Sequence, residues 1–342
     1  IMNQQPRLLV FCTLSTGLDA IAEVLRQGYK VSTIVGVNPL RGDSIKISGF
    51  IDIKLFAAKW SIPYIYMSRY DMKSEADRQR IESLEFDLVW VAGWQRLIPG
   101  WVLARAPLGT LGSHGSPDGI HGGRGRSPQN WAIMFGCQRF DLALFRITEG
   151  IDNGPVIAER SFFYNETDDI GISYKKVSLC LASMVLEVLK NPGLLEAGYD
   201  QPENAFYYPQ RSPEDGFADW NLTQLEIWAH CRALTTPYPG LRTKSDGGEI
   251  IIWKCLPFDD TIRGAAGQVD MVFEDSCFLV SCGDGRVLVQ EYEIIGESFP
   301  ITNGMQLISL EFSGILSAIV AKHQAKYPQM PVTQRILRRL PK

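Results

Sequence analysis

The stretch from Leu111 to Ile133, "LGSHGSPDGIHGGRGRSPQNWAI", concentrates residues that could do chemistry, including two of the chain's four histidines. His114 closes GTLGSH, a run typical of a short strand, and the glycine-rich segment after it is almost without apolar residues before Trp131. Residues two apart on a strand point to the same side, so Gly112 and His114 would share one face. The pattern favours a polar loop that wraps a ligand at the carboxyl end of a strand.

A second polar turn could supply a carboxylate partner. Strand-like runs over 141–148 and 155–164 are joined by EGIDNG, which contains Asp152. If this turn lies at the same sheet edge, His114 and Asp152 would form an acid–base pair, an arrangement worth roughly 10²- to 10⁴-fold in rate. The spacing of these residues does not distinguish such a pair from a purely structural histidine that is hydrogen-bonded to a nearby acid.

Short strands alternate with helices before this stretch. Strand-like runs cover 8–13, 31–37, 64–67 and 87–92, and helical spacing covers 18–29, 50–60 and 75–84. The alternation predicts an α/β fold with a Rossmann-like, mostly parallel sheet and helices on both faces. No G-x-G-x-x-G follows the first strand, so a dinucleotide site is not expected. Ser127 and Pro128 are typical of the cap and first residue of a helix, and 172–190 is a long helical segment.

The composition changes after the first 195 residues. Residues 196–220 are rich in Pro, Gly, Tyr and acid, which indicates a linker with aromatic anchors. Beyond a helix at 222–235, short strands separated by turns predict a smaller β-rich, OB-like barrel. We therefore divide the chain into a catalytic domain over 1–204 and a β-rich domain with a basic tail over 205–342.

Composition and charge exclude several classes of protein. The chain of 342 residues carries a net charge of −4, which argues against a dedicated nucleic-acid binder. Its apolar runs are too short to span a membrane, and its first residues do not resemble a signal peptide. The seven cysteines include no C-x-x-C pair, which indicates neither a disulfide framework nor a zinc site. We expect a reduced, cytoplasmic protein without a metal or a membrane partner.

Three blocks carry a family resemblance. AGWQRLIPGWVL (92–103) is similar to a folate-binding segment, and 109–133 resembles the signature N-x-H-P-S-L-L-P-x-x-R-G-x-x-P-x-x-W-A-I. ITEGIDNGPVI (147–157) resembles a D-x-G turn. These are features of the 10-formyltetrahydrofolate-dependent formyltransferases, which include methionyl-tRNA, glycinamide ribonucleotide and nucleotide-linked amino-sugar enzymes. PQRSPEDGFADWN and ALTTPYPGLRT also resemble the C-terminal part of the methionyl-tRNA and aminoarabinose enzymes.

The resemblance implies a reaction and a set of site residues. Domain 1–204 would move a formyl group from 10-formyltetrahydrofolate, its co-substrate, to an amine. His114 would donate to the tetrahedral oxyanion, while Asp152 would hold His114 charged and oriented and help to move the amine's proton. The residues expected to bind the folate are Trp94, Gln95, Arg96, Leu97, Ile98, Glu149, Gly150, Ile151 and Asp152.

One position departs from the family pattern. The family has Asn two residues before the histidine, where this chain has Gly112. Loss of an oxyanion donor typically costs about 10²- to 10³-fold in rate. Ser116, His121 and Asn130 could replace it, and the usual L-P gives way to DGIHGG, so the loop is reshaped.

Basic residues near the loop indicate where an acceptor could bind. Arg124 and Arg126 precede the helix at Ser127 and could form an anion site, with Ser116 as a further substrate contact. Arg41 or Lys46, in the loop over 37–53, could reach the acceptor's anion when that loop closes; the alternative is that both are solvated loop charges.

The charge of the second domain bears on the identity of the acceptor. Residues 204–300 hold seven Lys and Arg against fifteen Asp and Glu, and a tRNA-binding domain should be basic. We favour a small amine, an amino sugar that is often nucleotide-linked. The alternatives are methionyl-tRNA or another amine such as a hydroxyornithine, a hydrolase, and a folate-binding homologue with altered or lost chemistry. The sequence leaves a homodimer open.

Overall fold

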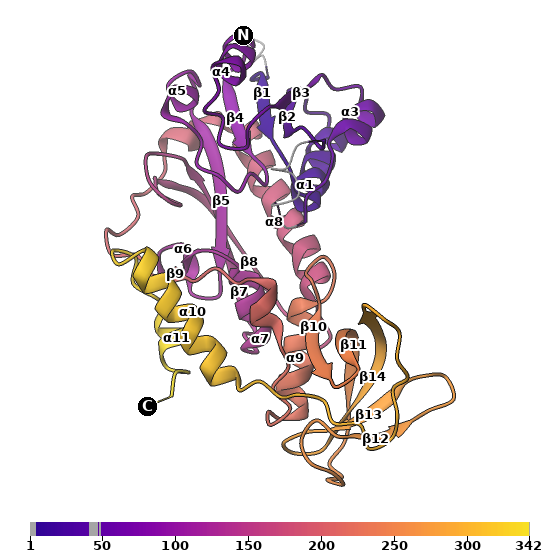
Figure 1. The fold of residues 1–342 in the computed structure, drawn as a ribbon. Helices are drawn as coiled ribbons and strands as arrows, with labels where there is room; N and C mark the ends of the chain where they lie inside the picture. The colour runs from indigo at the N-terminus through magenta and orange to yellow at the C-terminus, as the bar shows by residue number, and fades with distance from the viewer. Residues whose placement is uncertain (1–4, 41–46, 48, 342) are drawn as a thin grey trace. The chain divides into compact units, whose positions relative to one another are not determined.

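The computed structural model describes residues 5–40, 47 and 49–341, and the chain forms two compact units (Figure 1). Unit 1 consists of Ile1–Arg124, Asp141–Phe162 and Tyr174–Asn204, and unit 2 consists of Gly125–Phe140, Phe163–Ser173 and Ala205–Lys342. The division at 204/205 stays a prediction.

A seven-stranded sheet in the order β3-β2-β1-β4-β5-β7-β8 organises unit 1. Its strands are β1 (Leu8–Phe11), β2 (Val31–Val37), β3 (Tyr64–Met67), β4 (Leu88–Val91), β5 (Thr110–Ser116), β7 (Arg139–Arg146) and β8 (Val156–Phe163). The first five strands pair in parallel, and β7 runs antiparallel to β5. The predicted Rossmann-like, mostly parallel sheet is thereby confirmed.

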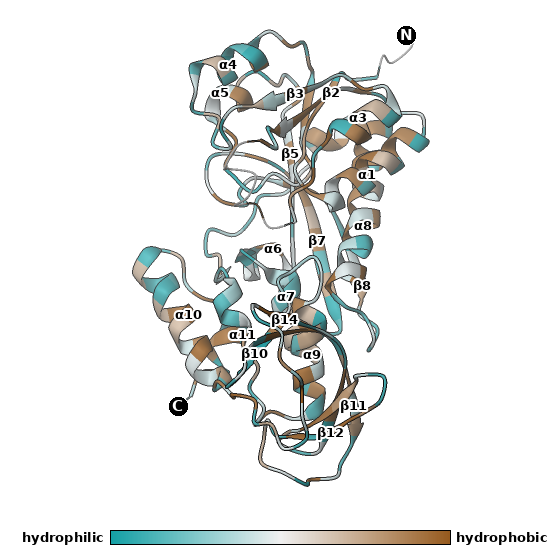
Figure 2. Cartoon of the chain, turned by 45° about the vertical axis from the view of Figure 1, so that its right-hand side comes forward, coloured by the Kyte–Doolittle hydropathy of each residue, from teal (hydrophilic) through white to brown (hydrophobic). Residues whose placement is uncertain are grey.

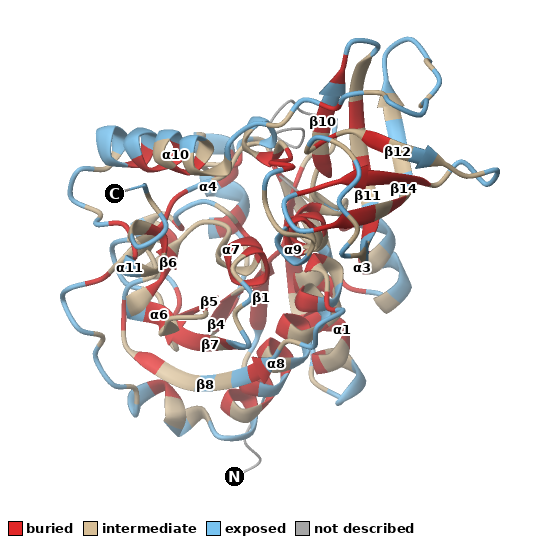
Figure 3. Cartoon of the chain, turned by 90° about the horizontal axis from the view of Figure 1, so that it is seen from below, coloured by how far each residue is buried: buried red, intermediate tan, exposed pale blue. Residues whose placement is uncertain are grey.

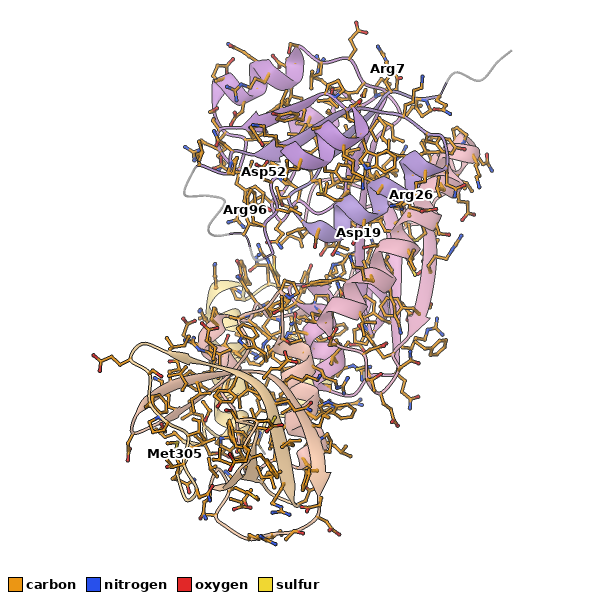
Figure 4. The ribbon with its side chains drawn as sticks, turned by 90° about the vertical axis from the view of Figure 1, so that its right-hand side faces the viewer. Arg7, Asp19, Arg26, Asp52, Arg96 and Met305 are labelled. Carbon is orange, nitrogen blue, oxygen red and sulfur yellow. The ribbon has the colours of Figure 1, made fainter. Side chains whose placement is uncertain are left out.

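Helices cover both faces of this sheet because its strands are apolar on both sides. They are α1 (Ser15–Arg26), α3 (Lys54–Trp60), α4 (Glu75–Glu82), α5 (Gly100–Leu103) and α8 (Ile170–Lys190). On one face, Leu9 and Phe11 form a core with residues of α4 and α5. Elsewhere α1 and α8 lie side by side, joined by an ion pair between Asp19 and Lys175 (Figures 1 and 4). In Figure 3 β1 is coloured as buried, whereas the edge strand β8 is largely intermediate or exposed.

Strand β5 is longer than predicted, and this changes the setting of His114. Its ladder with β7 runs from Leu111↔Arg146 to Ser116↔Asp141, whereas its parallel pairing with β4 ends at Leu111. His114 therefore lies within a strand rather than at its end. The predicted loop after β5 also contains α6 (Gly119–Gly122) and β6 (Arg124–Gly125).

Helix α7 (Pro128–Met134) begins where predicted, but its cap differs. Ser127 has φ 58°, and in the described structure its side chain caps no backbone N–H of the helix. A capping side chain needs an extended backbone at this position, and the left-handed conformation of Ser127 does not supply it.

Unit 2 is built on a five-stranded antiparallel sheet in the order β10-β11-β14-β13-β12. Its strands are β10 (Leu241–Ser245), β11 (Gly248–Asp259), β12 (Val269–Val272), β13 (Phe278–Ser281) and β14 (Arg286–Ile295). Its helices, besides α7, are α9 (Gln224–Leu234), α10 (Phe312–Lys326) and α11 (Gln334–Leu337). Figure 2 shows brown, apolar strands beside teal turns in this unit.

The segment predicted as a linker is packed rather than free. It begins at the end of the 3₁₀ helix η1 (Pro192–Glu196) and contains the 3₁₀ helix η2 (Pro213–Gly216) and the short strand β9 (Tyr207–Tyr208). Tyr208 and Trp220 are fully buried, so the predicted aromatic anchors are present. Over the described part of the chain, no helix is long and apolar enough to cross a membrane.

Two helical glycines should respond oppositely to substitution by alanine. A Cβ at Gly17 of α1 would lie 1.7 Å from the carbonyl oxygen of Ala92, whereas no described heavy atom lies within 4 Å of a Cβ at Gly314 of α10. We expect Gly17→Ala to destabilise by about 1–3 kcal/mol or more. Gly314→Ala should stabilise by about 0.5–1 kcal/mol. Urea unfolding followed by circular dichroism measures both, and equal shifts of the same sign would contradict the packing described for Gly17.

Candidate active site

The site lies where the strand order of unit 1 reverses. The chain runs from β1 to β2 and β3 on one side, and β4 and β5 lie on the other side of β1. The carboxyl ends of strands at such a switch point form the usual ligand crevice of an open α/β sheet. Here the backbone N–H and the hydroxyl of Thr13 donate to the carbonyl of Gly93 at 3.0 and 2.8 Å, which ties the ends of β1 and β4 together. Burial raises the pKa of the neighbouring Cys12 thiol to about 12, which favours the protonated thiol near pH 7.

The predicted folate segment, 94–98, follows directly and belongs to no helix or strand. Trp94 packs edge-on against Phe11 and Tyr70, with ring centroids 5.4 and 4.8 Å apart. The hydroxyl of Tyr70 accepts a hydrogen bond of 2.6 Å from the backbone N–H of Gln95, and the guanidinium of Arg96 lies 5.2 Å from its ring centroid. Figure 4 shows Arg96 at the edge of unit 1. The segment is therefore fixed at Trp94 and Ile98, which are buried, while Arg96 and Leu97 are exposed.

His114 and Asp152 come together in the structure. Nδ1 of His114 lies 3.4 Å from Oδ2 of Asp152, and its Nε2 lies 2.7 Å from the carbonyl oxygen of Gly123. Both ring nitrogens thus face oxygen acceptors, and only a doubly protonated ring can donate to both. The two side chains are 10% and 23% exposed, so a ligand can still reach them.

The turn between β7 and β8 holds Asp152 in an unusual conformation. Gly150, Asp152 and Gly154 have φ of 111°, 49° and 121°. A Cβ at Gly154 would lie 1.9 Å from the carbonyl oxygen of Arg146, so only glycine fits there. Asn153 closes the turn by donating its amide to the carbonyl of Glu149 at 3.2 Å. The predicted folate contacts at Glu149, Gly150 and Ile151 lie on this turn, the first two of them exposed.

Gln201 contacts the site, although it lies in the segment predicted as a linker. Its amide nitrogen donates to the carbonyls of Asp152 at 3.1 Å and Gly154 at 2.8 Å. Its amide oxygen accepts from the guanidinium of Arg124 at 2.6 Å. Arg124 is only 5% exposed, and the structure as described shows no partner for its Nε. A single glutamine in a Pro- and Gly-rich stretch carries no sequence signal for such a contact.

The space that a side chain at Gly112 would need is filled by Ile147. A Cβ at Gly112 would lie 2.8 Å from both Cγ1 and Cδ1 of Ile147. The face that Gly112 shares with His114 is therefore apolar at this point, and Ile147 takes the place that the side chain of the family's asparagine would need.

The three candidate replacements for that asparagine stay predictions, and the structure gives each of them its own setting. The hydroxyl of Ser116 donates to the carbonyl of Gly119 at 2.8 Å, and His121 is exposed. In unit 2, the amide of Asn130 donates to the carbonyl of Ala233 at 2.6 Å. Two of the three groups are thus already engaged elsewhere.

The remaining predicted site residues have other settings. The backbone N–H of Arg126 donates to the carbonyl of Tyr208 at 3.1 Å within unit 2. Arg41 and Lys46 lie outside the described residues. Of the residues that can be described, no group of three or more His, Cys, Asp or Glu is arranged to hold a metal ion.

A cavity of about 910 Å³ lies within unit 2, lined by residues of α7, α9 and α10. The residues predicted for the site do not line it. It offers His230, whose pKa is lowered to about 3 by burial, so that this imidazole is neutral near pH 7. The chemistry described above is therefore separate from this cavity.

The chain matches the formyl transferase family over residues 15–188, just over half of its length, and the formyl transferase C-terminal domain over 211–299. It therefore belongs to the formyl transferase family, which confirms the resemblance seen in the sequence. The bifunctional polymyxin resistance protein ArnA of Wigglesworthia glossinidia brevipalpis is 28% identical over 253 residues, which are 72% of this chain and 37% of ArnA. Methionyl-tRNA formyltransferase of Syntrophus aciditrophicus is 25% identical over 293 residues, which are 84% of this chain and 91% of that enzyme.

Solved structures share the fold. HypX from Aquifex aeolicus in complex with tetrahydrofolic acid aligns with a TM-score of 0.59 and 20% identity, covering 93% of this chain and 48% of HypX. The N-formyltransferase of Helicobacter canadensis, in complex with folinic acid and dTDP-3-aminofucose, aligns with a TM-score of 0.57 and 14% identity, covering 83% of this chain and 98% of that enzyme. The chain thus spans about a third of ArnA and about half of HypX.

The close approach of Ile147 to Gly112 leads us to predict how substitutions at these two positions change the free energy of unfolding. Gly112→Asn should destabilise by about 1–3 kcal/mol because Ile147 must move. Removing the obstacle with Ile147→Ala in the same chain should recover part of that cost, so the two changes should be non-additive by about 1 kcal/mol or more. Urea unfolding of the two single variants and the double variant gives the coupling, and strictly additive effects would contradict the packing described.

Proposed function

We propose that this chain is an N-formyltransferase that moves a formyl group from 10-formyltetrahydrofolate to the amine of a small acceptor, and that this acceptor is an amino sugar of the kind that is often linked to a nucleotide. The observation that carries the proposal is the pair of His114 and Asp152, whose Nδ1 and Oδ2 atoms lie 3.4 Å apart, in the same unit as the segment 94–98 that follows β4 at the switch point of the sheet. Membership of the formyl transferase family supports the same reaction.

The residues present fit a reduced folate. A pterin is a flat heterocycle with a donor–acceptor edge, and irregular main chain such as 95–97 can pair with that edge. The indole N–H of Trp94, for which the described residues offer no acceptor, is a buried donor that a ligand could satisfy. The turn over 149–152 would line the other side. HypX and the Helicobacter canadensis enzyme were solved with folates bound, which supports this assignment.

The side chains supply the proton handling. The acceptor amine attacks the formyl carbon, forming the new N–C bond, and the bond from that carbon to N10 then breaks. His114 would donate to the oxygen on which negative charge develops. Asp152 would keep the imidazole charged and oriented, and the proton lost by the amine would pass through this pair to N10.

An amino sugar is the acceptor class that the charges support best. The acidic stretch from 204 to 300 opposes polyanion binding, while the buried guanidinium of Arg124 offers one positive charge near the Asp152 turn. The Helicobacter canadensis enzyme, which was solved with dTDP-3-aminofucose, supports a nucleotide-linked sugar.

A second candidate function rests on Ile147. Because Ile147 fills the space beside Gly112, the chain could be a folate-binding homologue whose transfer chemistry is altered or lost. Formation of a formylated amine in the assays below separates the two.

Substitutions at the paired residues should abolish transfer without loss of folding. We expect His114→Ala and Asp152→Asn each to lower kcat by about 10²-fold or more. Asp152 lies on a turn, and the pairing of His114 with Ala143 is made by the backbone, so both variants should stay folded. Product formation from 10-formyltetrahydrofolate and dTDP-3-aminofucose is the assay, and tetrahydrofolate binding by calorimetry is the control for the folate site. Near wild-type turnover in either variant would remove the assigned roles.

The net negative charge of the second domain leads us to predict weak binding of tRNA. Initiator methionyl-tRNA should bind only weakly at physiological salt, and the binding should fall steeply with added salt. A gel-shift titration at two salt concentrations measures this. Sub-micromolar binding at physiological salt would instead favour methionyl-tRNA as the acceptor.

A further inference from the structure

We propose that Gln201 is a positioning residue for formyl transfer: its amide fixes the turn that carries Asp152 and couples that turn to the buried guanidinium of Arg124. This inference rests on the proposed function. It concerns a residue outside the motifs that the family resemblance rests on.

The amide of Gln201 is fully used in one network. A primary amide has two N–H groups and one carbonyl oxygen. The N–H groups donate to the carbonyls of Asp152 and Gly154 at 3.1 and 2.8 Å, and the oxygen accepts from Arg124 at 2.6 Å. All three partners lie in unit 1, and two of them belong to the turn that presents Asp152 to His114.

The turn needs such a support because of its backbone. Gly150, Asp152 and Gly154 all have positive φ, and a residue with a side chain, such as Asp152, adopts that region rarely. The two carbonyls that Gln201 binds, those of Asp152 and Gly154, lie on either side of the peptide bond between Asn153 and Gly154. Holding both of them fixes the direction in which the carboxylate of Asp152 leaves the backbone, and hence its distance from Nδ1 of His114.

Arg124 strengthens the support. Its guanidinium is 5% exposed, and the ion pairs found among the described residues do not include one to Arg124. A cation at the oxygen end of an amide polarises it and makes its N–H groups better donors. The positive charge of Arg124 therefore strengthens the hydrogen bonds that Gln201 donates to the Asp152 turn.

The chemistry explains why glutamine suits this position. A glutamate would pair with Arg124 but would set carboxylate oxygens against two carbonyl oxygens, where donors are needed. A leucine of similar size would lose all three hydrogen bonds. Gln201→Glu and Gln201→Leu thus remove the donors while keeping nearly the same volume.

The test separates positioning from a general loss of structure. We expect each variant to lower kcat by up to about 10²-fold, since a small misplacement of a catalytic group can cost that much. KM for dTDP-3-aminofucose should change little. In a chain that already carries Asp152→Asn, Gln201→Leu should lower single-turnover rates by less than about twofold, because residues that act through one another are not additive.

The matched control is Gln210→Leu, at an exposed glutamine nine positions along the same segment. It should leave kcat, KM and the melting temperature at wild-type values. Equal kcat in wild type and both Gln201 variants would overturn this inference, and so would a Gln201→Leu cost that is the same with and without Asp152→Asn. Absence of any formyl transfer by the wild-type chain would instead overturn the proposed function and this inference with it.

Discussion

The antiparallel pairing of β5 with β7 is the constraint on which the site depends. The pairing of β5 with β4 ends at Leu111. From there to Ser116, the direction of β5 is set by its pairing with β7. Because β7 runs against β5, it ends beside the start of β5, and the turn that follows can fold back toward His114. A shift of one residue in this ladder would turn His114 to the opposite face of the sheet.

The same pairing determines what surrounds the histidine. Ile147 continues the ladder by donating its N–H to the carbonyl of Thr110 at 2.7 Å, and its side chain then covers Gly112. An apolar group thereby fills the space beside Gly112, the position at which this sequence departs from the asparagine of the signature. His114 consequently has Asp152 and the carbonyl of Gly123 as its polar neighbours rather than a neighbouring asparagine.

The sequence was informative where short-range pattern governs structure. Buried runs such as LLVF and LVWV predict the parallel strands, since β1 is buried at every position and β4 at three of four. The EGIDNG turn and the i, i+2 rule together bring Asp152 and Gly112 into consideration with His114. Their roles stay predictions.

Local sequence patterns do not predict the contacts that depend on packing between segments distant in the chain. The end of β5 at Ser116 is set by hydrogen bonds to β7, not by its own glycines. The filling of the space at Gly112 depends on one rotamer of Ile147, 35 positions along the chain. The hydrogen bonds of Gln201 span 47, 49 and 77 positions, and no local propensity encodes them.

Gln201 also lies between the two stretches that match the family, 15–188 and 211–299. Under the proposed role of Gln201, the segment between these two stretches contributes to the site rather than serving only as a linker. Chimaeras that exchange whole domains between homologues would have to move residues 189–210 together with the N-terminal half, because a crossover upstream of Gln201 would separate Asp152 from its hydrogen-bond partner. Over evolutionary time, the same contact would favour inheriting the segment around Gln201 together with the N-terminal half, since both belong to unit 1.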